Sequence, residues 1–141
     1  MKKLTTKLMI AATVLVAASG AASAQSQPTM TAQIPFEFRV GNHIMAPGTY
    51  QVDKLDTGIF RLLDVHLRRP IVVLPQARVD PRKGSALGSP NLEFACAGGR
   101  CALAELWDGS HGGQAYKFRL PEMGKDDIHL AVIPLQRDKG E

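Results

Sequence analysis

Short stretches of alternating apolar and polar residues, interrupted by turn-forming residues at roughly every tenth position, constrain the fold of this chain most strongly. In the segment 34–40, Ile34, two phenylalanines and Val40 alternate with proline, glutamate and arginine. Successive side chains of a strand point to opposite faces, so this segment is predicted to be one strand with an apolar face. No segment shows the period of a long helix. The pattern therefore predicts an all-β fold, a small antiparallel sandwich or barrel of about eight short strands.

Turn signals set the expected ends of these strands. Gly41-Asn42 is expected to reverse the chain, and Pro47-Gly48 suits a type II turn in which the glycine takes a positive φ. Further strands are expected over residues 49–52, 59–65, 71–74, 91–96, 101–107, 115–120 and 128–135. The stretch 80–90 contains hardly any apolar residue and is expected to be a long exposed loop that could carry partner contacts.

The N-terminal residues have the three parts of a secretory signal. Lys2, Lys3 and Lys7 are followed by an apolar run over residues 8–18, which is about half the length of a membrane-spanning helix. The small residues Ala22 and Ala24 then predict cleavage after Ala24, which makes Gln25 the mature N-terminus. A short uncleaved anchor is the alternative. These features predict a periplasmic or secreted protein, with no transmembrane segment in the mature chain.

The predicted cleavage divides the chain into a signal peptide (1–24), a polar leader (25–30), a single β domain (31–135) and a charged tail (136–141). Three of the 17 Lys and Arg residues lie in the signal peptide and none of the 13 Asp and Glu residues do. The mature chain therefore has 14 basic and 13 acidic residues, a net charge of +1. Such a balance gives no electrostatic basis for binding nucleic acid or anionic lipid.

The two cysteines, Cys96 and Cys101, flank a segment whose centre is Gly98-Gly99. Both glycines accept the positive φ of a two-residue type I′ hairpin turn. The residues next to the glycines then form a hydrogen-bonded pair, and the cysteines form the next, non-hydrogen-bonded pair, with Cα atoms about 4.5 Å apart. That distance is within the range of a disulfide. Continuing the register places Ala95 opposite Ala102 and Phe94 opposite Leu103, so residues of similar size pair.

We expect the cysteines to form a structural disulfide in an oxidising compartment, worth about 2 kcal/mol in the loop-entropy model. A redox site is the first alternative, although redox pairs usually lie at a helix start. A zinc site is the second, and it would need two more ligands besides the nearby His111.

Residues with catalytic or metal-binding chemistry are scattered. The histidines are His43, His66, His111 and His129. By alternation, Asp64 shares a strand face with His66, and Asp127 with His129. Each pair could provide two metal ligands or an oriented general base, or could be a solvated charge pair at a strand end.

A serine, a histidine and a carboxylate occur together in the loop 108–113, but a hydrolase triad needs its groups brought from separate, rigid positions. The paired basic residues Arg68-Arg69 and Arg82-Lys83 are interpreted as solvated loop charges. Trp107, Tyr50 and Tyr116 could line a ligand pocket or belong to the core.

Two segments resemble a large group of small exported β-proteins of unknown function that is abundant in acidobacteria. The segment 35–42, followed by 46–52, is similar to the family's Phe-x-Phe-x-Val-Gly strand and its Pro-Gly-x-Tyr turn. The segment from Leu92 to Trp107 resembles its hairpin that opens with an aromatic residue and ends in tryptophan. Where the family often has aromatic or basic residues beside that turn, this chain has its two cysteines. The resemblance implies export and a β fold.

The sequence predicts no catalytic residue, no cofactor and no metal ligand set. The leading hypothesis is a non-enzymatic interaction or structural module of the cell envelope or exterior, with a protein or envelope partner. A small β-barrel that binds an apolar ligand is the alternative, and it requires an interior cavity. A hydrolase or metalloenzyme is the second alternative, and it requires polar groups that converge on His66 or His129.

Overall fold

The computed structural model describes residues 29–56, 58–80, 89–109, 115–124 and 127–138. These residues form strands and connecting segments and contain no helix, hence none that could cross a membrane. The strands are β1 (Met30–Ile34), β2 (Phe38–Val40), β3 (His43–Met45), β4 (Gly48–Asp56), β5 (Ile59–Asp64), β6 (Pro70–Val73), β7 (Ala77–Val79), β8 (Asn91–Ala97), β9 (Arg100–Trp107), β10 (Ala115–Lys117), β11 (His129–Pro134) and β12 (Gln136–Arg137). The expected all-β class is confirmed, with more strands than expected.

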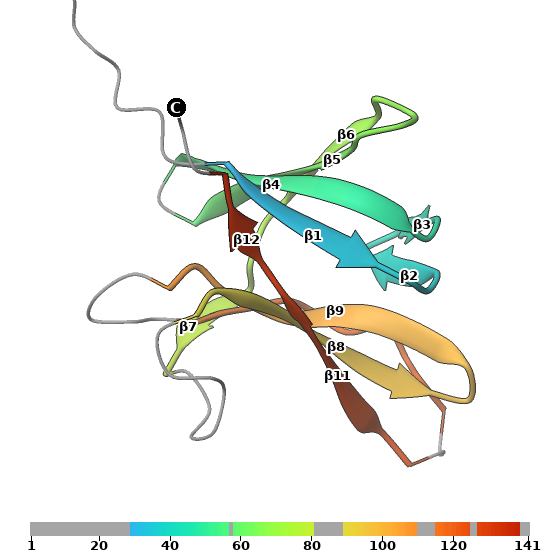
Figure 1. The fold of residues 1–141 in the computed structure, drawn as a ribbon. Helices are drawn as coiled ribbons and strands as arrows, with labels where there is room; N and C mark the ends of the chain where they lie inside the picture. Colours follow the sequence, from blue (N-terminus) through green and yellow to red (C-terminus); the bar gives the residue numbers. More distant parts are fainter. Residues whose placement is uncertain (1–28, 57, 81–88, 110–114, 125–126, 139–141) are drawn as a thin grey trace, which may run out of the picture.

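The strands form two sheets that face each other (Figure 1). The first sheet has the order β12-β1-β4-β5-β6, and all its pairs are antiparallel. The second has the order β11-β8-β9-β10-β7, and β2 and β3 extend it from β9. The pair β2–β9 is parallel, unlike the antiparallel pairing that the sequence predicted.

Each passage of the chain from one sheet to the other contains a proline. Pro35 lies between β1 and β2, Pro47 between β3 and β4, and Pro75 between β6 and β7, while Pro134 ends β11 before β12. Proline has no backbone N–H and cannot donate to a strand ladder, so pairing stops where the chain must turn away from its sheet.

The first of these passages corrects the prediction of one strand over 34–40. Ile34 ends β1 in the first sheet, and Phe38 begins β2 in the second. Both side chains are buried, because each strand contributes its apolar face to the same core. Phe36 lies in the bend between them and is only partly buried. Alternation was therefore a valid signal of burial but a wrong signal of strand continuity.

The turn predictions had mixed outcomes. Gly41 has φ of 57° and lies in the β2–β3 hairpin turn, as expected from Gly41-Asn42. Gly48 has no positive φ and is the first residue of β4, so the type II turn predicted at Pro47-Gly48 is wrong. Proline alone interrupts pairing at this position, and no left-handed residue is needed.

Aromatic and aliphatic side chains from both sheets fill the core. The largest fully buried side chains are Tyr50, Phe38, Phe60, Phe94, Ile34, Leu62, Leu92, Leu103, Leu106 and Val52. The Phe38 ring packs edge-to-face on Tyr50 of the first sheet, with ring centres 5.2 Å apart, and on Phe94 of the second, at 5.3 Å. Phe38 therefore joins the two layers.

Three short strands were not expected from the sequence. β3 and β7 are three residues long, too short to show an alternating pattern, and β12 lies in the segment predicted to be a charged tail. Gln136 and Arg137 pair with Thr31 and Met30 of β1. The paired part of the domain therefore begins at Met30 and extends beyond residue 135.

Candidate functional site

The cysteine hairpin has the predicted geometry. Gly98 and Gly99 have φ of 56° and 76°, and Cys96 pairs with Cys101. Their Cα atoms are 4.1 Å apart, and the two residues form a disulfide. The Ala95–Ala102 and Phe94–Leu103 pairs are also confirmed. Cys96 belongs to the hydrophobic core and Cys101 packs against it, so the disulfide is part of the packed structure.

Several predicted residues lie outside the described part of the chain. These are the cleavage residues Ala22, Ala24 and Gln25, most of the loop 80–90 with Arg82 and Lys83, and Ser110 and His111. The predictions made for them remain predictions.

The Asp64 carboxylate stabilises the turn that joins β5 to β6. One of its carboxylate oxygens accepts hydrogen bonds from the backbone N–H groups of His66, at 2.9 Å, and Leu67, at 3.1 Å. The imidazole of His66 is not the partner, although the sequence placed both residues on one face. The pair is therefore a turn-stabilising contact, and His66 is exposed.

Tyr50 lies opposite Asp64 in the β4–β5 ladder and is fully buried. Its hydroxyl donates a hydrogen bond to the carbonyl of Ala46, in the passage between β3 and β4. Burial and, next, the Asp64 carboxylate raise the pKa of Tyr50 from 10.0 to about 12. Tyr50 therefore stays neutral at ordinary pH and holds the connection at Pro47 against the core.

The other two described histidines, His43 and His129, do not gather into a site. His43 is exposed in β3, and His129 is exposed in β11 close to Asp127 in sequence. Within the described ranges, no group of three or more His, Cys, Asp or Glu side chains could hold a metal ion. Arg68 and Arg69 are exposed in the β5–β6 turn.

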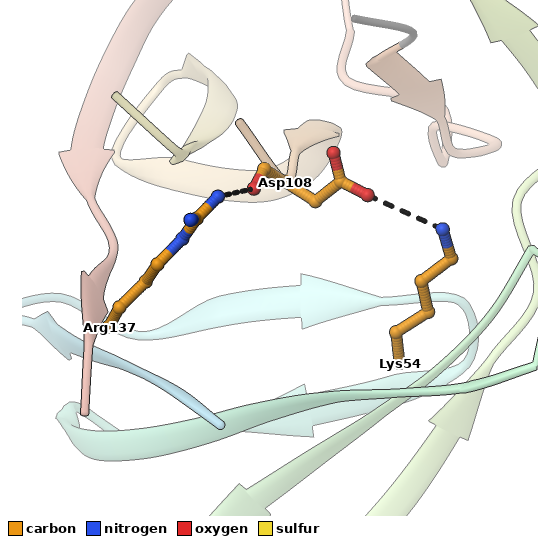
Figure 2. A network of polar contacts seen from close by, with 3 residues as sticks. All are labelled: Lys54, Asp108 and Arg137. Carbon is orange, nitrogen blue, oxygen red and sulfur yellow. Dashed lines mark hydrogen bonds and ion pairs between the residues drawn. The ribbon is translucent and has the colours of Figure 1, made fainter. Parts of the chain in front are cut away.

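A polar cluster that the sequence did not predict connects the two sheets at the end of β9 (Figure 2). The Lys54 ammonium of β4 contacts a carboxylate oxygen of Asp108 at 3.4 Å. The Arg137 guanidinium of β12 donates to the Asp108 backbone carbonyl at 3.0 Å. Lys54 and Arg137 belong to the first sheet, and Asp108 follows a strand of the second. One aspartate thus binds two cations across the layers.

Two aromatic residues lie close to this polar cluster: Tyr116 beside Lys54, and Trp107 directly before Asp108. The Lys54 ammonium lies 5.3 Å from the centre of the Tyr116 ring, and Tyr116 itself is buried in the core. Desolvation lowers the pKa of Lys54, but interactions with Tyr116 and Asp108 outweigh it and raise this pKa. Trp107 is half-buried, and its indole N–H has no hydrogen-bond partner among the described residues. Tyr50 and Tyr116 are thus core residues, as one of the two interpretations expected.

A surface groove of about 250 Å³ lies beside β6, the last strand of the first sheet. Its apolar wall includes Val72, Leu74 and Phe118, and its polar side includes His43 and Arg119. Val72 and Leu74 are exposed. The groove is open to solvent and lies outside the core.

The end strand of the second sheet, β11, also exposes apolar side chains. Leu130 and Val132 are exposed, whereas Ala131 and Ile133, which alternate with them, pack against the core. A sheet edge with exposed apolar residues and unpaired backbone groups is a template for pairing with another strand.

Comparison with known protein families, with curated protein sequences and with solved structures finds no match to this chain.

Proposed function

We propose that this chain is an exported, non-enzymatic interaction or structural module that binds a protein partner of the cell envelope or exterior through its surface. The observation that carries the proposal is the groove beside β6, where Val72 and Leu74 present apolar side chains to solvent. Burying such side chains against a partner is favourable, by about 25 cal/mol per Å² of apolar surface.

Export is supported by the N-terminal pattern of three lysines, an apolar run and the Ala22-Ser23-Ala24 motif. The Cys96–Cys101 disulfide suits a periplasmic or secreted location, since disulfides persist in oxidising compartments. The resemblance to small exported β-proteins supports the same location.

The apolar-ligand alternative has less support. A ligand-binding barrel needs interior volume, and the space between these sheets is filled by side chains such as Tyr50, Phe38 and Phe60. The hydrolase or metalloenzyme alternative has less support as well, because the Asp64 carboxylate is engaged by backbone N–H groups of its own turn.

The proposal is tested by capture from envelope extract with exported protein as bait. Val72→Lys places a charge at the groove and should abolish capture of partners that bind there. Leu55→Lys is the matched control, because Leu55 on β4 is 50% exposed, against 57% for Val72, but does not line the groove. Equal capture by wild type and both variants would contradict the groove as the binding surface.

A further inference from the structure

The free edge of β11 is formed by the backbone of its two exposed apolar residues. Hydrogen bonds alternate along an antiparallel ladder, and the two-residue turn makes Ala97–Arg100 a hydrogen-bonded pair. The backbone groups of Ala95 therefore point to β9, and those of Cys96 and Phe94 point to β11.

Cys96 and Phe94 pair with His129 and Ala131, whose backbone groups consequently point back to β8. The N–H of Leu135 bonds to the carbonyl of Pro90 at 2.9 Å, which continues the same alternation. The N–H and C=O groups of Leu130 and Val132 thus point away from the sheet, and β11 is a terminal strand among the described residues.

This edge lacks the features that normally prevent strands from pairing between molecules. The segment 128–135 contains no Lys, Arg, Asp or Glu. Natural edge strands are usually protected by such charges, by prolines or by bulges. β6, the end strand of the other sheet, begins with Pro70 and is followed by Pro75, whereas β11 has a proline only at its end.

We infer that β11 pairs with β11 of a second copy of this chain, antiparallel about a two-fold axis at Ala131. In this register Leu130 lies opposite the partner's Val132, and the two residues exchange both backbone hydrogen bonds. Their side chains lie on the outer face, where each apolar side chain covers the other.

Charge supports a second copy as the occupant. The uncharged strands approach without repulsion. In this register Asp127 lies opposite the partner's Leu135, two residues from the partner's Arg137 in β12, whose guanidinium also donates to the Asp108 carbonyl. The predicted mature net charge of +1 adds little repulsion between copies. The inference goes beyond the proposed function, because β11 is a different surface from the groove beside β6.

The test is the sedimentation of exported protein over a wide range of concentration, with folding monitored by circular dichroism. Wild type should dimerise, and Val132→Lys should raise the dimer dissociation constant by about tenfold or more. Leu55→Lys is the matched control, since Leu55 is 50% exposed and Val132 is 55% exposed. Monomeric wild type, a dimeric Val132→Lys variant, or loss of the dimer in Leu55→Lys would each overturn the inference.

A cysteine scan tests the register by a second, covalent measurement. Ala131→Cys should form a disulfide between copies, because a residue on the axis faces its own counterpart at about 4.5 Å between Cα atoms. Leu130→Cys should not, since it faces the partner's Val132. The reverse pattern would overturn the register. A monomeric protein that still captures an envelope partner through the groove would contradict self-pairing and leave the proposed function intact.

Discussion

The cysteine hairpin and the passage from β1 to β2 differ in what determines them. In the hairpin, two glycines with positive φ fix the turn, and the turn fixes every pair outward to Phe94–Leu103. In the segment 34–40 the same alternation of apolar residues is present, yet Pro35 separates two strands of different sheets. Local turn chemistry thus specifies local pairing, whereas the sheet that a strand joins depends on residues far away in sequence.

The largest expected effect concerns the two phenylalanines of the passage. Phe38→Ala should lower the free energy of unfolding by about 3 to 5 kcal/mol, because the side chain is fully buried between the sheets. Phe36→Ala should cost about half as much or less, because Phe36 is only partly buried. Denaturant unfolding measures both. Equal losses would favour a single continuous strand over the split that the structure has.

This pair of variants also marks how far the sequence could predict the fold. Alternation placed Ile34, Phe36, Phe38 and Val40 on one apolar face, and all of them except Phe36 are fully in the core. The glycine turn predicted the disulfide and its register. Neither signal could predict β3 and β7, since those short strands pair through their backbones with little apolar patterning. The contact of Lys54 with Asp108 was missed because it joins residues far apart in sequence, with no local motif to mark it.

The second effect concerns Tyr50, which secures the next proline passage. The folded protein raises the Tyr50 pKa to about 12, so the neutral form is favoured in the folded state. The resulting stability is fully present below pH 10 and is lost as the pH rises toward about 12, by roughly 2 to 3 kcal/mol. Denaturant unfolding at a series of pH values measures this loss of unfolding free energy with rising pH. Tyr50→Phe should make the loss smaller, and an unchanged loss would argue against Tyr50 as its source.

The third effect concerns the hairpin. Replacing Cys96 and Cys101 together by alanine should lower the free energy of unfolding by about 2 kcal/mol and leave the hairpin register unchanged, because the glycines set the turn. Calorimetry measures the stability, and amide exchange of β8 and β9 measures the register. Loss of protection throughout both strands in a protein that stays folded would show that the disulfide, rather than the turn, specifies the pairing.

The smallest effect concerns the polar cluster between the sheets. Asp108→Asn should lower the free energy of unfolding by about 1 kcal/mol, since it weakens a partly buried contact with Lys54. The ion pair of Arg61 with Asp53 joins β4 and β5 within one sheet and is the matched control. Double-mutant cycles give the two coupling energies. A Lys54–Asp108 coupling of zero would mean that the cluster does not help to hold the sheets together.

The proposed function depends on the groove beside β6 rather than on His66, His111 or His129. The most direct measurement is the affinity for the captured envelope partner of Val72→Lys beside His66→Ala, His111→Ala and His129→Ala. We predict that the histidine variants bind within about threefold of wild type, as expected for changes worth about 0.5 kcal/mol. Val72→Lys should lose at least about tenfold in affinity. A folded histidine variant that loses the interaction while Val72→Lys retains it would contradict the account.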